Sequence, residues 1–166
     1  MSCPPPKSIA RTGWTTAELQ TAIVNAHNQH AYGLVSLLIG VNNQYCGQTV
    51  SVYCTEFRAL LGLAVGFAGG RPGWVLVLSI PDWGQSLFAR KQAHDPVRTG
   101  VKIDQFNAVA QYECRQAGVA YVDITPLTRA AASDAGQFAC DGLHYSGSQM
   151  RQWTEQALPV VRRLLK

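Results

Sequence analysis

Three segments of the chain are apolar on both faces, and segments with helical periodicity separate them. The apolar segments are residues 34–39, 74–80 and 121–125. Strands that are covered by helices on both sides read as continuous apolar runs instead of alternating polar and apolar positions. The alternation of such strands with helices therefore predicts an α/β layer fold around a parallel sheet.

Four helices are expected from apolar residues that recur every three or four positions. The stripes are Leu19 to Ala26, Tyr53 to Ala64, Ile103 to Ala117 and a last one after Ser146 that includes Met150, Trp153, Ala157, Val160, Val161 and Leu164.

The sequence also marks where these helices begin and end. Thr15 with Glu18, and Ser146 with Gln149, have the spacing of capping boxes. Gly118 is expected to end the third helix, and Pro159 is expected to kink the last one. Residues 81–100 show little periodicity after a strand, which leaves two interpretations open, a functional lid or a mobile connection.

Composition indicates one folded domain, over residues 1–166. Hydrophobic residues make up 47% and charged residues 14% of the 166 positions, which argues against disorder. The longest apolar runs are far shorter than the roughly 18 residues that cross a bilayer, so no membrane span is expected. The first residues, MSCPPPKS, lack the apolar run of an export signal, which favours the cytoplasm.

Charge and cysteine content exclude further classes of function. The net charge is +4, but the basic residues are scattered, so nucleic-acid binding is not expected. The five cysteines are widely spaced and include no C-x-x-C pair. Neither a disulfide framework nor a structural metal site is expected, and reduced, mostly packed thiols are the simpler interpretation.

Candidate chemistry lies where ligands bind in open parallel sheets, beyond the carboxyl ends of the strands. Gly13 precedes a helix start, so its N–H can face a developing oxyanion, and the Asn42 amide supplies a second donor. Asp141 and His144 lie three residues apart in a turn, where the carboxylate can fix the imidazole tautomer and leave the other nitrogen to act as a base.

Each of these residues alone also has a purely structural interpretation. Gly13 reads as a turn glycine, Asn42 as a loop-capping residue, and an Asp-x-x-His pair as a surface or capping contact. Their joint occurrence, each after a strand or before a capped helix, favours a catalytic set.

At these residues the sequence resembles the SGNH, or GDSL-type, hydrolase family of esterases, lipases and carbohydrate deacetylases. The resemblance rests on three blocks, ARTGWTT (residues 10–16), GVNN (40–43) and DGLH (141–144), and extends over essentially the whole chain. It implies a flavodoxin-like three-layer α/β fold. It also implies that Gly13 and Asn42 are oxyanion donors, His144 the general base and Asp141 its carboxylate partner.

Two departures from the family pattern are mild and one is severe. Asn43 stands where the family usually has Asp, and Tyr145 where it often has Pro. The family's first block, a Gly-Asp-Ser turn that carries the nucleophile, has no counterpart in this sequence. Only eleven residues precede Thr12, too few for a β-α unit, so the chain resembles a member without that unit. Its absence would leave strand edges unpaired, which makes a homodimer one expectation.

Other residues are candidates for the nucleophile, for a metal site or for the substrate pocket. Ser86, Ser146 and Cys46 are candidate nucleophiles, although Ser146 reads better as a helix cap and Cys46 as a packed thiol. A zinc site from Cys140 and His144, with Asp141, has no further ligand pair to support it. His94 and Asp95 are expected to be solvated. For the substrate pocket the candidates are Gly40, Asn43 and Asp82, and for Asp82 a cap of the following turn is favoured over pocket lining.

Three functions compete at this point. The first is hydrolysis of ester bonds in small acyl esters, lysophospholipids or acetylated sugars by a Ser-His-Asp mechanism that needs no cofactor, with the serine absent and the chain alone weak or inactive. The second is a binding module or inactive remnant of the same fold. The third, nucleotide binding, lacks both the G-x-G-x-x-G and the P-loop motif.

Overall fold

The structure is a computed structural model, and it describes residues 6–166. The expectations for Cys3 and for the prolines before residue 6 lie outside the described residues. The helices are α1 (Thr16–Asn25), α2 (Val41–Tyr45), α3 (Val50–Phe67), α4 (Leu87–Lys91), α5 (Pro96–Ala117), α6 (Thr125–Ala130) and α7 (Gly147–Leu164). The strands are β1 (Val35–Leu37), β2 (Val75–Leu78) and β3 (Ala120–Val122).

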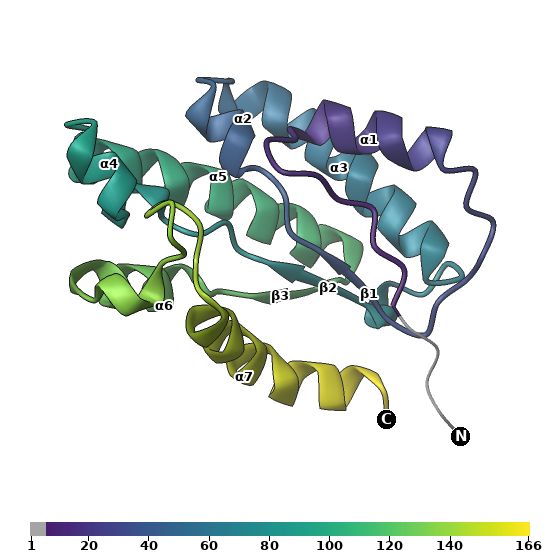
Figure 1. Cartoon of the computed structure of the whole chain (residues 1–166). Helices are drawn as coiled ribbons and strands as arrows, with labels where there is room; N and C mark the ends of the chain where they lie inside the picture. Colours follow the sequence, from purple (N-terminus) through teal and green to yellow (C-terminus); the bar gives the residue numbers. More distant parts are fainter. Residues whose placement is uncertain (1–5) are drawn as a thin grey trace.

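The three strands form a parallel sheet in the order β1-β2-β3. The register pairs Val35 with Val75 and Leu78 with Val122. Helices α1, α3 and α5 lie on one face of the sheet, and α6 and α7 lie on the other (Figure 1). The predicted three-layer α/β fold is confirmed. The three strands are neighbours in the sheet, as are the last three strands of the flavodoxin-like order.

The helix boundaries follow the signals in the sequence. Thr15 and Glu18 form the expected capping box of α1, with the Thr15 N–H donating to the Glu18 carboxylate over 2.7 Å. Gly118 ends α5 in the left-handed conformation, at φ 68°, which glycine adopts without steric cost. Short helices α2 and α6 were not foreseen, because elements of five and six residues carry too little periodicity.

Helix α7 agrees with its prediction only in part. The Ser146 side chain accepts a hydrogen bond from the Gln149 N–H, so the helix is capped as expected. The reciprocal bond of a capping box is missing, since the Ser146 N–H donates to the Gln137 carbonyl instead. The helix continues through Pro159 to Leu164. Only part of its expected apolar face is buried: Ala157 is buried, but Met150 is half exposed.

Residues 81–100, expected from the sequence to be a long loop, contain regular secondary structure. They fold into a 3-10 turn (Trp83–Gln85), helix α4 and the first turn of α5. Side chains of Asp82, Ser86 and Asp95 cap these three elements by accepting hydrogen bonds from backbone N–H groups. Caps of this kind set helix starts without an apolar repeat, so periodicity alone missed them.

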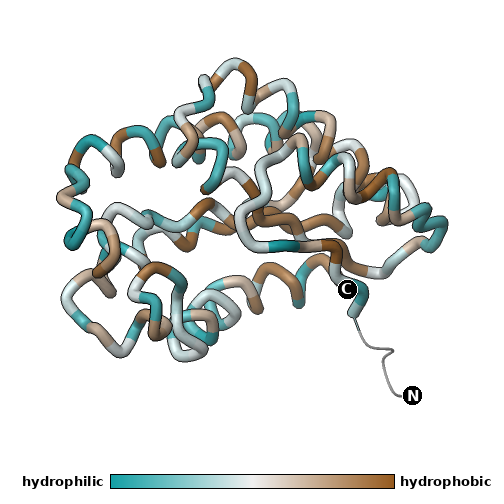
Figure 2. The backbone as a smooth tube through the Cα atoms, turned by 45° about the horizontal axis from the view of Figure 1, so that its top comes forward, coloured by the Kyte–Doolittle hydropathy of each residue, from teal (hydrophilic) through white to brown (hydrophobic). Residues whose placement is uncertain are grey.

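The core lies between the sheet and helices α3 and α5. Tyr53, Phe57, Leu60 and Leu61 of α3 are almost fully buried against the strands. Apolar positions gather in the central strands, while the helices alternate between apolar and polar positions (Figure 2). Judged by length and composition alone, helix α3 is long and apolar enough to cross a membrane. No membrane span is expected from the sequence, because its unbroken apolar runs are short. The packing of α3 in the core is equally typical of the central helix of a globular domain.

The thiols are less uniformly packed than the sequence indicated. Cys114 is buried and Cys54 half-buried, but Cys46 and Cys140 are exposed. Among the described residues, no group of three or more metal-ligating side chains is present.

Candidate functional site

A cavity of about 530 Å³ opens where the segment before α1, the loop after β1 and the loop before α7 meet. Gly13, Gly40, Asn42 and His144 all line it, although as many as 131 positions separate the first from the last. The carboxyl end of a parallel sheet is where loops diverge and helix N-termini point inward. The structure therefore gathers most of the sequence-predicted residues around one space.

Asp141 binds the imidazole ring of His144 through its carboxylate. Its Oδ2 lies 2.5 Å from the His144 Nδ1, while Oδ1 accepts the backbone N–H groups of Leu143 and His144, each over 2.9 Å. Gly142 makes this tight turn possible with a φ of 69°, and a Cβ there would lie 3.2 Å from Leu87. With Nδ1 directed at the carboxylate, Nε2 remains as the basic nitrogen.

The Asp141 carboxyl is strongly stabilised in its ionised form. The hydrogen bond from His144, followed by those from the Leu143 and His144 N–H groups, lowers the pKa of Asp141 to about 2. Both side chains are about half exposed. The pair thus forms an ionised orienting group next to an imidazole that solvent and substrate can reach.

Asn42 and Gly13 line the same cavity from two different segments of the chain. Asn42 is in the first turn of α2, and its Nδ2 donates to the Trp14 carbonyl over 2.9 Å. That bond ties the α2 turn to the segment that carries Gly13 and uses one of the two amide hydrogens. Gly13 has a φ of 90°, a conformation in which side-chain-bearing residues are strained.

The backbone conformation and the close approach of Tyr53 both require a glycine at position 40. It has a φ of 125°, and a Cβ at this position would come within 2.8 Å of the Tyr53 ring. The Tyr53 hydroxyl donates to the Ile39 carbonyl in the same turn. The core residue Tyr53 therefore sets the path of the chain between β1 and Asn42.

Two of the sequence-predicted pocket residues do not line this cavity. Asn43 is fully buried; its Oδ1 accepts the Thr16 N–H, and its Nδ2 donates to the side chains of Thr16 and Gln48. Asp82 is also fully buried, where it caps the turn at Gly84 as favoured from the sequence. Both side chains are satisfied by protein partners in the interior.

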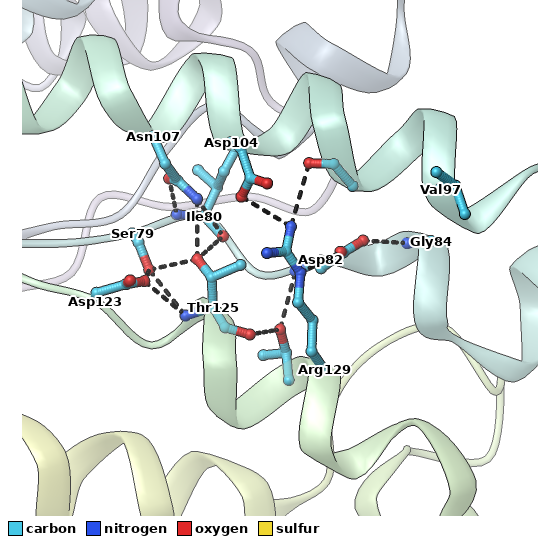
Figure 3. A network of polar contacts seen from close by, with 12 residues as sticks. Ser79, Ile80, Asp82, Gly84, Val97, Asp104, Asn107, Asp123, Thr125 and Arg129 are labelled. Carbon is cyan, nitrogen blue, oxygen red and sulfur yellow. Dashed lines mark hydrogen bonds and ion pairs between the residues drawn. The ribbon is translucent and has the colours of Figure 1, made fainter.

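A polar network behind the carboxyl ends of β2 and β3 supports one wall of the cavity (Figure 3). Arg129 donates to Asp82 and to Asp104, over 2.8 Å each. The Ser79 hydroxyl donates a hydrogen bond to the Asp123 carboxylate, and it accepts hydrogen bonds from the Ile124 N–H and from the Thr125 hydroxyl. Because Asp82 belongs to this network, its neighbours Pro81 and Trp83 are held against the cavity.

Most of the remaining wall is aromatic, and the sequence analysis did not identify it. The rings come from Trp14, Tyr45, Trp83, Tyr145 and Trp153. Trp83 is fixed by a hydrogen bond from its Nε1 to the Gln44 Oε1, and His94 packs edge-on against it with ring centroids 4.9 Å apart. His94 and Asp95 are both exposed, as expected from the sequence, and Asp95 in addition caps α5.

The candidate replacement nucleophiles lie elsewhere. Ser86 is fully buried and caps α4, and Ser146 caps α7. Cys46 ends α2 and is exposed, outside the cavity lining. Within the part of the chain that the structure describes, no serine lines the cavity, and Thr12 is the one aliphatic hydroxyl there.

Comparisons with known proteins show the family and the fold of this chain. The model of the GDSL-like lipase/acylhydrolase family matches residues 6–151. A putative GDSL-like lipase from Parabacteroides merdae is similar in structure, with a TM-score of 0.73 and 17% identity over 93% of this chain and 70% of that one. An acetyl xylan esterase variant from Geobacillus stearothermophilus gives 0.68 and 16% over 90% and 68%. A lipase/acylhydrolase from Enterococcus faecalis gives 0.61 and 16% over 92% and 71%. A search of curated proteins finds no match.

Proposed function

Because this chain belongs to the GDSL-like lipase/acylhydrolase family, we propose that its cavity holds the base and oxyanion donors of a carboxylic-ester hydrolase. The observation that carries the proposal is the cavity shared by Gly13, Asn42 and the imidazole of His144, with Asp141 bound to the ring behind it. Acyl transfer needs these groups together, since the base and the oxyanion donors act on the same carbonyl.

His144 is the general base in this proposal. Asp141 accepts the Nδ1–H and stabilises the imidazolium that forms, while Nε2 takes the proton of an attacking hydroxyl. The oxygen of the attacking hydroxyl then bonds to the ester carbonyl carbon, and the carbonyl oxygen becomes an oxyanion. When the oxyanion collapses, the bond between the carbonyl carbon and the alcohol oxygen breaks. The alcohol leaves with the proton from His144. Water, activated by the same base, releases the acid and restores the hydroxyl.

Gly13 and Asn42 stabilise the oxyanion. The Gly13 N–H is a fixed backbone donor, and Asn42 keeps one amide hydrogen beyond its bond to the Trp14 carbonyl. Removal of one such donor raises the barrier to acyl transfer by about 3 kcal/mol. The bond to Trp14 orients the amide before substrate arrives.

The wall of the cavity favours small esters with an apolar part. Its lining is dominated by aromatic and aliphatic side chains, such as Leu38, Trp83 and Trp153, and basic groups are few. Apolar walls with a few placed polar groups are typical of sites for small molecules. Short acyl esters of apolar alcohols fit this lining best.

Hydrolysis of 4-nitrophenyl acetate tests the proposal. No serine lines the cavity in residues 6–166, so the chain is expected to show only weak turnover, in which His144 activates water. His144→Ala should abolish the turnover that exceeds the buffer rate. His30→Ala is the control, because His30 is an exposed histidine outside the cavity lining. Equal rates for the parent and His144→Ala would contradict the assignment of the base.

A binding module is the second candidate, favoured by the lack of a cavity serine among the described residues. Such a protein would bind an ester without cleaving it. Trp14, Trp83 and Trp153 line the cavity, so ligand binding should change the tryptophan emission. Saturable quenching by phenyl acetate, together with no His144-dependent hydrolysis, would favour the binding module over the hydrolase.

A further inference from the structure

The solvent-facing side of helix α5 exposes large apolar side chains. Val97 is 74% exposed, Val101 55% and Tyr112 51%. The buried residues of the helix, such as Ile103 and Phe106, lie on the opposite side, which packs against α3 and β3. A surface helix normally carries polar residues on its outer side. Single exposed apolar residues are ordinary, whereas several on one face mark a surface that another body covers.

The exposed apolar residues of α5 lie on one face. Val97 and Val101 are four positions apart, and Val101 and Tyr112 are eleven apart. At 3.6 residues per turn, all three lie within about 60° of one another around the helix axis. Ala108 is also exposed and falls between them on the same face. We call Val97, Val101, Ala108 and Tyr112 the outer face of α5. It extends over about 22 Å of the helix.

Basic side chains border the outer face. Arg98, Lys102 and Arg115 are all exposed, and none of the three forms an ion pair with another described residue. The Cζ atom of Arg115 lies 5.6 Å from the centroid of the Tyr112 ring. The helix thus presents apolar side chains to solvent between positive charges.

The acidic residues of α5 have partners of their own. Asp104 binds Arg129 of α6, and the buried Glu113 binds Arg58 of α3, over 2.8 Å each. Asp95, at the start of the helix, accepts hydrogen bonds from the first free backbone N–H groups. The basic side chains that border the outer face are therefore left to attract an anionic partner.

An anionic lipid surface matches this combination of groups. Helices that lie in a membrane interface place apolar side chains in the headgroup region and carry Lys or Arg beside them. Each Lys or Arg near an anionic membrane strengthens binding by about fivefold. Tyrosine is favoured at such interfaces, because its ring is apolar and its hydroxyl is polar. The outer face of α5 and its border supply all three features.

Two other partners match the outer face less well. A two-fold interface joins identical surfaces, so a second copy would bring a second set of basic side chains toward Arg98 and Lys102. Like charges at that distance repel one another. Nucleic acids are held through phosphate contacts, to which the exposed valines contribute nothing.

The outer face begins next to the cavity of the proposed site. His94 lies just before the N-cap of α5, and its ring packs against Trp83 of the cavity wall with centroids 4.9 Å apart. Tyr45, which also lines the cavity, is 50% exposed, and its ring centroid lies 6.3 Å from that of His94. A lipid surface on the first turns of α5 would therefore lie close to the cavity.

We propose that the outer face of α5 binds anionic phospholipid membranes peripherally, with its valines and Tyr112 in the headgroup region and the bordering basic side chains on the lipid phosphates. The helix lies along the surface and does not cross the bilayer. This binding does not depend on the hydrolase function, because it uses neither His144 nor the oxyanion donors.

Sedimentation with lipid vesicles tests the proposal on the whole protein. Vesicles of equal parts phosphatidylglycerol and phosphatidylcholine should bind the protein saturably, and vesicles of phosphatidylcholine alone should not. Binding should weaken about tenfold or more when salt rises from about 0.05 M to about 0.5 M, because salt screens the attraction. His144→Ala should bind like the parent protein, which separates this test from that of the hydrolase.

Two charge variants locate the binding face. Arg98→Gln combined with Lys102→Gln should weaken binding to the anionic vesicles about twentyfold. Arg162→Gln combined with Arg163→Gln removes the same charge from the exposed end of α7, on the other side of the sheet (Figure 1). This second pair should change binding less than about twofold, because salt screens charges that lie far from the bound surface.

A matched pair of valines tests the apolar contribution. Val101→Gln should weaken binding about fivefold, because the side chain leaves the headgroup region for water less favourably than a polar one gains there. Val24 is 60% exposed on α1, outside the outer face, so Val24→Gln should leave binding unchanged. Circular dichroism and thermal midpoints show whether the variants fold.

Four outcomes would overturn the proposal. The first is the absence of saturable binding to the anionic vesicles at low salt. The second is an equal loss in the α5 and α7 charge variants, since net charge alone would then explain the binding. The third is binding that Val101→Gln leaves unchanged, because the apolar side chains would then stay outside the lipid. The fourth is a concentration-dependent dimer that Val101→Gln disrupts, which would assign the outer face to a second copy.

Discussion

The Nδ1 atom of His144 lies 2.5 Å from the Oδ2 atom of Asp141, and the other oxygen of that carboxylate accepts two backbone N–H groups of the same turn. One carboxylate thereby sets both the shape of the turn and the orientation of the ring.

The neutral His144 ring should be protonated at Nδ1. The Asp141 carboxylate can only accept a hydrogen bond, so it favours the tautomer that leaves Nε2 free. Nitrogen chemical shifts from a long-range proton–nitrogen correlation spectrum distinguish the two tautomers. Asp141→Asn should shift the ring toward a mixture, and Asp134→Asn, a turn carboxylate next to no histidine, should leave the signals in place. A neutral His144 ring that is protonated at Nε2 in the parent protein would contradict the proposed role of Asp141 in fixing the tautomer.

The stabilising effect of Asp141 should disappear in acid. Its pKa is held at about 2 by the His144 hydrogen bond and the two N–H groups, below the value of about 3.9 in an unfolded chain. A lowered pKa in the folded state stabilises the fold above pH 4, and this contribution is lost as the pH falls through 2. The difference in thermal midpoint between the parent and Asp141→Asn should therefore shrink from pH 5 to pH 2. A difference that stays constant over this range would argue against the hydrogen bonds as its source.

Removal of Arg129 should destabilise the protein far more than removal of its exposed partner. Asp82 is fully buried and depends on Arg129, so Arg129→Met leaves a buried carboxylate without its counter-charge. Loss of one member of a buried pair costs about 3–5 kcal/mol of unfolding free energy. Asp104→Ala removes the exposed half of the network and should cost about 1 kcal/mol or less. Urea denaturation measures the unfolding free energy of both variants. Similar losses in the two variants would contradict the importance of the buried pair of Arg129 and Asp82.

Gly40→Ala should damage both stability and the cavity. The added Cβ would meet the buried Tyr53 ring at 2.8 Å in a backbone conformation that alanine avoids. Strain of this kind costs about 1–3 kcal/mol. Because Gly40 immediately precedes α2, the Asn42 amide should move, which chemical shifts of its side-chain NH₂ group would report. Gly73→Ala is the control, since open space surrounds that position.

The resemblance to a known family and the periodicity of the chain predicted most of the architecture. Continuous apolar runs gave the three strands and the order of layers, and caps such as Thr15 with Glu18 gave helix starts to within a residue. These features depend on neighbours a few positions away, which the sequence displays directly. The capped turns of residues 81–100 were misjudged, because single capping side chains carry no repeat.

What the sequence determined by itself is therefore local: which segments are strands or helices, and that Asp141 and His144 share a turn. Only the tertiary structure decided which polar residues reach the cavity. It turned Asn43 and Asp82 into the interior, where buried partners satisfy them, and it left Asn42, one position from Asn43, in the lining. The physical reason is that a side chain's exposure is set by the elements that pack around it, and those elements come from distant parts of the chain.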